Sequence, residues 1–396
     1  MLCMIKHTLL VARLGLFTGV LILMSACSYI PWIGGDEEVV IEPRTPTELT
    51  EVPQEVVILK NWEVSIGGDT QEEYVRVNPH IFNEKIAFAQ PGGVVAVFNI
   101  TDGRNLWTTD LKVTISGGIG GNQQVLVVGT LDGEVIGLQV EDGGKIWDLD
   151  AGSEVVAISS VAGDVIVARL NDNRLLGIDS ASGEKLWTVP QSPPALTLRG
   201  ANTPIIPDNM VYAGMDNGKV VAVSTSGNLI WEARVSVPSG RNELQRLVDV
   251  DGQMSADQFR VYAASYHGRV VAINQSDGSI AWARDIPSVA GVTIDDNLVF
   301  VSDRDDNVWA LEKDSGVSVW KQDGLLYRSV SMPVIQENVV LVGDFEGYLH
   351  VLSKEDGRFV GRTRLSKNPI HSSDVGTSNV SYISDTKGRL ASLTIQ

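Results

Sequence analysis

The sequence predicts an all-β protein: an eight-bladed β-propeller of four-stranded antiparallel blades, closed by its N-terminal strand. Three observations support this prediction. Tryptophans recur about every forty residues, a glycine lies four residues before most of them, and a short turn rich in Gly and Asn appears eight times. About forty residues hold four short strands with their turns, and radial repetition of four-stranded sheets is the propeller architecture.

The tryptophan repeat sets the period. The tryptophans are Trp62, Trp107, Trp147, Trp187, Trp231, Trp282 and Trp320. The glycines that precede the last six of them by four residues are Gly103, Gly143, Gly183, Gly227, Gly278 and Gly316. A further unit at 355–361 keeps its glycine, Gly357, but has no tryptophan. A functional aromatic residue has no reason to recur in every blade, so we expect the tryptophans to pack in the core between blades.

The strands and turns within one repeat alternate regularly. In the repeat at 210–231, apolar runs of about five residues are separated by clusters of Gly, Asn, Asp and Ser, which are hairpin signals. The turn before the third strand appears at 90–93, 131–133, 170–173, 216–218, 266–268, 304–307, 345–347 and 386–388. Gly and Asn suit this turn because they tolerate a positive φ, which a β-branched residue resists. Eight turns predict eight blades.

The two ends of the chain predict how the ring closes. Trp62 lies in a tryptophan strand with nothing of its own blade before it, and residues 380–396 supply the earlier strands of a blade but stop before a tryptophan strand. We therefore expect the Trp62 strand to complete the last blade, which leaves no open sheet edge. The propeller then spans residues 58–396.

Composition agrees with a folded single domain and excludes some functions. The 396 residues are 43% hydrophobic, and a propeller of this length is stable because each blade packs only on its neighbours. The net charge of −18 argues against a nucleic-acid-binding surface, which would be basic. The two cysteines, Cys3 and Cys27, precede the predicted propeller, so it holds neither a disulfide nor a thiolate site.

The N-terminus predicts export. Lys6 and Arg13 flank a short apolar stretch that is too short to span a bilayer, so residues 1–26 are predicted to be a signal peptide. The Ser-Ala-Cys sequence that ends at Cys27 resembles a bacterial lipoprotein box, which implies that Cys27 carries lipid. Ser28 after it favours, by the same resemblance, the periplasmic face of the outer membrane. A secreted protein whose cysteine lies there by chance is the alternative.

A tether is predicted between the lipid and the propeller. Residues 27–57 are rich in Pro, Glu and Thr and have no hydrophobic pattern that could form a core. A flexible coil of this length reaches roughly 30 Å. We expect it to hold the propeller near the membrane while the propeller docks on a neighbour.

Catalytic residues, metal ligands and a cofactor site are not expected. The histidines His80, His267, His350 and His371 fall in different repeats, and none has a neighbour at metal-ligand spacing. The Gly-Gly pairs lie in strand-turn contexts rather than before helices, so phosphate-binding loops are not expected. The acidic stretch at 303–306 is explained by the repeated turn rather than by a pair of catalytic carboxylates.

Particular segments resemble known families. The segment at 177–187, Gly-Ile-Asp-Ser-Ala-Ser-Gly-Glu-Lys-Leu-Trp, resembles the quinoprotein propeller repeat, and related copies lie at 272–282 and 310–320. The whole chain, including 196–200, 246–251 and 342–350, resembles the propeller lipoproteins of the outer-membrane β-barrel assembly machinery. This resemblance implies a non-catalytic scaffold that binds the periplasmic POTRA repeats of the central barrel subunit and assists folding and insertion of β-barrel proteins. Other lipoproteins of the machinery would be indirect partners, and unfolded outer-membrane proteins are further candidate partners.

Two other functions stay open at this point. A quinone-dependent dehydrogenase needs basic residues for the cofactor carboxylates, a Ca²⁺ site and a base near the reactive carbonyl. Such enzymes are also longer and usually have a cysteine pair over the cofactor. An adhesion or ligand-sensing propeller that uses its central channel is the second alternative. A purified protein that shows no quinone absorbance and captures the assembly machinery would exclude both.

Two irregular loops predict a docking patch. One follows Trp187 and is stiffened by prolines, and the other is the long insertion after Trp231. Both emerge on the same face at adjacent blade junctions, and an apolar centre with charged residues around it is typical of protein interfaces. The predicted partner-binding residues are Leu196, Leu198, Arg199, Asp249 and Asp251. The family resemblance also implies them, since these positions match those implicated in holding the POTRA repeats. The alternative is that the leucines pack inward and Arg199 pairs with one of the aspartates.

Overall fold

The computed structural model describes residues 44–67, 78–200, 202–377 and 379–396. The chain divides into two units, residues 1–45 and 46–396, and every strand of the described residues lies in the second. The predicted signal peptide and Cys27 lie outside the described residues. Within the described ranges, no helix is long and apolar enough to cross a membrane.

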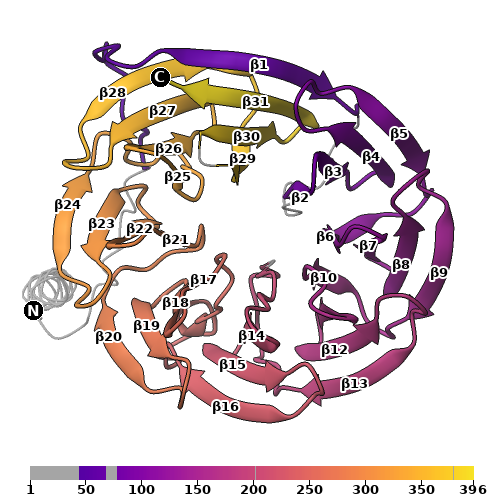
Figure 1. Cartoon of the computed structure of the whole chain (residues 1–396). Helices are drawn as coiled ribbons and strands as arrows, with labels where there is room; N and C mark the ends of the chain where they lie inside the picture. The colour runs from indigo at the N-terminus through magenta and orange to yellow at the C-terminus, as the bar shows by residue number, and fades with distance from the viewer. Residues whose placement is uncertain (1–43, 68–77, 201, 378) are drawn as a thin grey trace, which may run out of the picture. The chain divides into compact units, whose positions relative to one another are not determined.

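Eight antiparallel sheets follow one another around a ring (Figure 1), which confirms the predicted eight-bladed propeller. Blades 1 to 3 consist of β2 (His80–Phe82), β3 (Lys85–Ala89), β4 (Val94–Asn99) and β5 (Asn105–Asp110); β6 (Ile115–Gly121), β7 (Val125–Thr130), β8 (Glu134–Gln139) and β9 (Lys145–Asp150); and β10 (Val155–Ile158), β11 (Val165–Leu170), β12 (Arg174–Asp179) and β13 (Lys185–Pro190). Blades 4 and 5 consist of β14 (Met210–Gly214), β15 (Lys219–Ser224) and β16 (Leu229–Arg234); and β17 (Ser255–Ala256), β18 (Arg260–Ala264), β19 (Val270–Asn274) and β20 (Ile280–Arg284).

The second half of the ring follows the same plan. Blades 6 and 7 consist of β21 (Val292–Ile294), β22 (Leu298–Ser302), β23 (Val308–Glu312) and β24 (Ser318–Gln322); and β25 (Val334–Gln336), β26 (Val339–Gly343), β27 (Tyr348–Ser353) and β28 (Phe359–Arg364). Blade 8 consists of β29 (Ile370–Thr377), β30 (Val380–Asp385), β31 (Arg389–Ile395) and β1 (Ile58–Ser65). Blade 4 departs from the predicted four strands, because a single bridge between Ile205 and Tyr212 replaces its innermost strand.

The ring closes as predicted. Strand β1 pairs antiparallel with β31, from Ile58 opposite Ile395 to Ser65 opposite Arg389. Just before β1, Val57 and Gln396 exchange two backbone hydrogen bonds of 2.7 and 2.9 Å. The two ends of the propeller therefore share one sheet, with the N-terminal strand outermost (Figure 1).

The repeated tryptophans form the seams between blades. The Nε1 of each donates a hydrogen bond of 2.8 to 3.0 Å to a backbone carbonyl oxygen of the next blade. The repeat glycine of that next blade packs against the indole: a Cβ on Gly183, whose φ is 75°, would lie 2.6 Å from Trp147. Six of the seven tryptophans are buried, and Trp187 is partly buried. The prediction that they pack in the core between blades is confirmed.

The hydrophobic core is divided among the junctions in the same way. One cluster of buried residues lies at each of the eight junctions, formed by strands of two neighbouring blades. Each blade thus buries both of its faces, which explains the nearly continuous apolar runs of its middle strands.

The last part of the predicted tether belongs to the propeller. Thr47 N donates to Leu326 O at 2.9 Å, and Glu55 N donates to Val360 O at 2.7 Å. Val56 fills the space at the repeat position that has no tryptophan: a Cβ on Gly361 would lie 2.8 Å from its Cγ2. Residues 46–57 therefore pack on blades 6 and 7, beside the position where the repeat has no tryptophan.

Candidate functional site

Two irregular loops lie together on the face where the outermost strand of one blade leads to the next blade. Loop 191–209 joins β13 to β14, and loop 235–254 joins β16 to β17 and contains one turn of 3₁₀ helix, Leu244–Arg246. Leu198 N donates to Asp249 Oδ2 at 2.6 Å, which ties the loops together. The Asn202 side chain donates to Gly252 O at 2.5 Å and accepts from the backbone N–H of Gly214 at 3.0 Å. We call these two segments the paired loops.

The five predicted patch residues do not form one exposed surface. Leu196 is 40% exposed, whereas Asp249 and Asp251 are 0% and 8% exposed. Leu198 is half-buried, and Arg199 is exposed. The two aspartates therefore lie beneath the surface, whereas Leu196 and Arg199 reach it and Leu198 does so in part. Burial of the aspartates follows from their other partners, described below.

Arg199 does not pair with either aspartate, contrary to what the alternative interpretation expected. Its guanidinium Nη2 pairs with both carboxylate oxygens of Glu154, at 2.6 and 2.8 Å, and not with Asp249 or Asp251. Arg199 adopts a φ of 55°, in the left-handed region that a non-glycine residue rarely occupies. This backbone is held from both sides, because Leu198 N and Gly200 O each have a buried hydrogen-bond partner.

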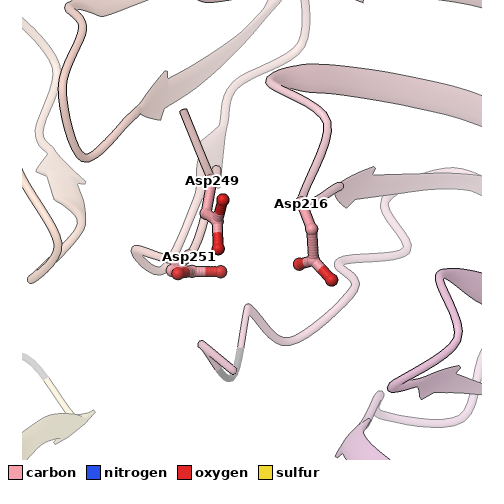
Figure 2. A group of neighbouring side chains, drawn as sticks. All are labelled: Asp216, Asp249 and Asp251. Atoms are coloured by element: carbon pink, nitrogen blue, oxygen red, sulfur yellow. The ribbon is translucent and has the colours of Figure 1, made fainter. Parts of the chain in front are cut away.

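Beneath the paired loops lies a buried cluster of three carboxylates and one guanidinium. Asp216 comes from the turn between β14 and β15, and Asp249 and Asp251 come from the second loop; one oxygen of each lies within 4.8 Å of the others (Figure 2). Arg169, at the end of β11, pairs through Nη2 with Asp216 and lies 4.0 Å from Asp251 Oδ1. Its Nη1 donates to Gly200 O at 2.8 Å.

Sequence reasoning missed Arg169 and Asp216. Asp216 was part of a repeated turn, where an acidic residue carries no signal. Arg169 does carry a sequence signal, because it is the one charged residue in the otherwise apolar run 165–170. In the structure its side chain is 1% exposed. A charged residue in a strand that is buried on both faces requires a buried partner.

The cluster contains three acidic side chains and one basic side chain, so acidic groups are in excess. The pKa of the Asp249 carboxyl is raised to about 6, mainly by burial and to a smaller extent by the negative charge of Asp216. Hydrogen bonds from Leu198 N and Thr197, together with the charge of Arg169, lower the pKa in part. Three carboxylates of this kind are suitable oxygen donors for a hard cation. The cation that faces Asp216 and Asp251 here is the guanidinium of Arg169.

Two cavities are lined by residues in or next to the innermost strands of several blades. One of about 450 Å³ is lined by Ser160, Thr203, Pro204, Gln253, Met254 and Ile294 among others, and one of about 200 Å³ by Asn78, His80, Ile119 and Met332 among others. Neither lining includes a Lys or Arg among the described residues, so neither supplies the cations that a quinone's carboxylates need. Burial lowers the pKa of His80, which keeps its imidazole neutral.

Another histidine has a structural role. His350 is fully buried in blade 7, where its Nε2 lies 3.1 Å from Asp344 Oδ2 and its Nδ1 accepts from Arg362 at 2.9 Å. Burial lowers its pKa more than the neighbouring carboxylate raises it. A buried, fully bonded imidazole has no access to a substrate, so this pair links strands rather than performing acid–base chemistry.

Comparisons with known proteins agree with the fold and point to one family. A family model described as "Outer membrane protein assembly factor BamB" matches residues 91–322. A protein of that name from Pseudomonas aeruginosa is 45% identical over 352 residues, covering 89% of this chain and 93% of the relative. One from Escherichia coli K12 is 34% identical, covering 94% of this chain and 96% of the relative.

Solved structures show the same fold in proteins of different function. The crystal structure of BamB from Moraxella catarrhalis has a TM-score of 0.78 at 24% identity, covering 85% of this chain and 100% of that one. A quinohemoprotein alcohol dehydrogenase from Comamonas testosteroni has a TM-score of 0.67 at 11% identity, covering 85% of this chain and 76% of that one. At these identities the likeness concerns the fold alone.

Proposed function

This chain belongs to the family of outer membrane protein assembly factors called BamB, and we propose that it acts in the assembly machinery as a non-catalytic scaffold. In this proposal it binds the periplasmic POTRA repeats of the central barrel subunit and assists the folding and insertion of β-barrel proteins. The observation that supports docking is the exposed apolar surface on the paired loops. On this surface Leu196 and Arg199 are exposed, and buried side chains hydrogen-bond the backbone on both sides of Arg199.

The proposed docking surface consists of Leu196, Leu198 and Arg199 of the first loop, which is hydrogen-bonded to the second loop through Leu198 N and Asp249. Val237 and Leu244 of the second loop are 61% and 65% exposed, so this loop also offers large apolar side chains to a partner. Asp249 and Asp251 lie underneath and support the surface without contacting the partner. Apolar residues at the centre with arginine beside them are what protein interfaces favour.

The proposal includes a lipid anchor at Cys27 on the periplasmic face of the outer membrane. The signal sequence and the lipoprotein box support it. Replacing Cys27 with alanine should abolish incorporation of labelled fatty acid and release the protein from outer-membrane fractions. Continued partition of Cys27→Ala with the outer membrane would require another anchor.

Docking is tested by capture of the purified POTRA repeats. Leu196→Ala and Arg199→Glu should each weaken capture by roughly tenfold or more, since truncating an interface anchor costs about 2 kcal/mol. Leu186→Ala is the matched control, because Leu186 is 48% exposed on the outer strand β13 and lies away from the paired loops. Melting temperatures are measured in parallel. Unchanged capture by both loop variants would refute the surface, and a matching loss of melting temperature would assign the leucine to folding instead.

A further inference from the structure

The docking surface has little regular structure of its own to hold its shape. Between β13 and β14 the chain runs as an irregular loop, and blade 4 lacks an innermost strand there. The residues on both sides of Arg199 are nevertheless fixed by buried groups: Asp249 Oδ2 accepts from Leu198 N, and Arg169 Nη1 donates to Gly200 O. The left-handed backbone of Arg199 depends on these two hydrogen bonds, because an L-residue avoids that region unless its surroundings enforce it.

We propose that Arg169 and Asp216 are positioning residues of the docking surface, and that the charge on Asp249 controls whether Leu196 and Arg199 are presented to the partner. This inference rests on the proposed docking function. Arg169 reaches the first loop only because Asp216 orients its guanidinium, and Asp249 holds the neighbouring residue only while it accepts from Leu198 N. Loss of either support allows the loop to leave the conformation that the partner binds.

The charge balance of the cluster makes Asp249 the group that changes state. One guanidinium faces three carboxylates that are all less than 9% exposed. Burial and the charge of Asp216 place the pKa of Asp249 near 6, so this carboxyl gains a proton within the mildly acidic range. Oδ1 of Asp249 is buried and accepts no hydrogen bond from the described residues. A proton there lowers the excess negative charge of the cluster.

Protonation has opposite effects on the loop and on the fold. The ionised carboxylate accepts a charge-assisted hydrogen bond from Leu198 N, and the neutral carboxyl accepts a weaker one. Partner binding should therefore weaken as the pH falls through about 6. The folded pKa lies above the ordinary value for aspartate, so uptake of this proton stabilises the native chain as the pH falls. Weaker binding with a more stable fold distinguishes this device from acid unfolding.

Other titratable groups near the paired loops must be separated from Asp249. Asp216, Asp251 and Arg169 face it directly, and the backbone N–H of Tyr266 donates to the Asp249 carbonyl oxygen from the neighbouring turn of blade 5. That turn also carries His267, whose imidazole interacts with the backbone at 245 and 247. Burial and the charge of Arg304 lower the pKa of His267 below its ordinary value, and a variant of this residue separates its contribution from that of Asp249.

The experiment measures the affinity of the full chain for the purified POTRA repeats between pH 7.5 and 5. The wild type should lose about tenfold in affinity across this range while its melting temperature does not fall. Asp249→Asn cannot become charged, so it should bind about tenfold more weakly than the wild type at pH 7.5 and show no further loss at pH 5. Asp306→Asn is the matched control: the pKa of Asp306 is also raised to about 6 by burial, but it lies in blade 6 and should keep the wild-type profile.

Further variants separate the positioning role from folding and from the docking surface itself. Arg169→Gln should weaken binding at every pH, and Arg169→Lys should restore part of it by keeping the charge beside Asp216. His267→Gln should retain the pH dependence. If Asp249→Asn follows the wild-type pH profile or binds with equal affinity, the control by Asp249 is overturned. If Leu196→Ala also binds normally, the docking surface fails; if Leu196→Ala binds weakly while Arg169→Gln binds normally, only the positioning role fails.

Discussion

Between blades 2 and 3, Trp147 packs on Gly183 and donates one hydrogen bond to Ser180 O. Between the paired loops, a buried guanidinium faces three carboxylates and several side chains reach across to backbone groups. The first kind of joint is apolar, local and repeated at seven junctions, and it favours the folded ring at any pH. The second, in which one guanidinium faces three carboxylates, lies between the paired loops, and its stability depends on the protonation of Asp249. Apolar packing between blades thus stabilises the ring, whereas a buried charged cluster holds the paired loops in place.

The seam is expected to contribute most to stability. Trp147→Ala should lower the free energy of unfolding by about 4 kcal/mol, because it removes a buried indole and leaves a cavity against Gly183. Ile146→Ala is the control in the neighbouring position, since Ile146 is 48% exposed and should change stability by less than about 1 kcal/mol. Denaturant unfolding followed by circular dichroism measures both. Equal effects of the two substitutions would contradict the seam.

The loop joint should respond strongly when its one cation is removed. Arg169→Met leaves three buried carboxylates without the guanidinium and should destabilise the chain by about 3 kcal/mol. Arg174→Met on the neighbouring strand removes a partly exposed ion pair with Asp172 and should cost less than about 1 kcal/mol. Adding Asp216→Asn to Arg169→Met should recover part of the loss, whereas additive losses would show that the two side chains act independently.

The same joint should become more stable when its charge is reduced. The pKa of Asp249 is about 6 in the folded chain, above its ordinary value of 3.8. The stabilising effect of its proton is therefore present at low pH and lost as the pH rises through about 6. At pH 7.5, Asp249→Asn should raise the free energy of unfolding by about 2 kcal/mol, and the gain should vanish near pH 4. Asp132→Asn in an exposed turn is the control and should not change the free energy of unfolding at either pH. If Asp249→Asn instead destabilised the chain at pH 7.5, excess negative charge in the cluster would be contradicted.

The smallest effect is expected at the one repeat position without a tryptophan. Val56→Ala should cost about 1 kcal/mol, because Val56 only partly replaces the missing indole at Gly361 and is itself half-buried. Val57→Ala is the control, since Val57 is 57% exposed. Thermal unfolding is sufficient to compare them. A loss as large as that of Trp147→Ala would show that this segment, rather than the pairing of β1 with β31, closes the ring.

The sequence predicts the seams well because every feature that builds them is local and repeated. A tryptophan, a glycine of positive φ and a tight turn recur at a fixed spacing, so the blades and the closing strand follow from a pattern within one chain. The prediction of four strands in every blade was wrong for blade 4, which has three. The innermost strand is missing where Pro193, Pro194, Pro204 and Pro207 remove backbone donors from the loop before β14.

The site was harder to predict because its contacts occur once and join distant residues. Proximity of the two loops follows from blade geometry, and so do the exposed positions of Leu196 and Arg199. The burial of Asp249 and Asp251 does not follow from blade geometry, because it depends on their contact with Arg169, which lies two blades earlier. Packing of residues 46–57 depends in the same way on a gap left by the glycine at position 361. Neither the buried cluster around Arg169 nor the packing of residues 46–57 produces a periodic pattern in the sequence.

The shared blade also orders events in time. Strand β1 is among the first of the propeller to be synthesised, and its partner β31 comes after the strands of the other seven blades. The first strand therefore stays unpaired until β31 has been made. An incomplete chain keeps an exposed strand edge that is prone to aggregation. A premature stop upstream of β31 leaves the ring open, so only a chain that includes β31 reaches the closed form.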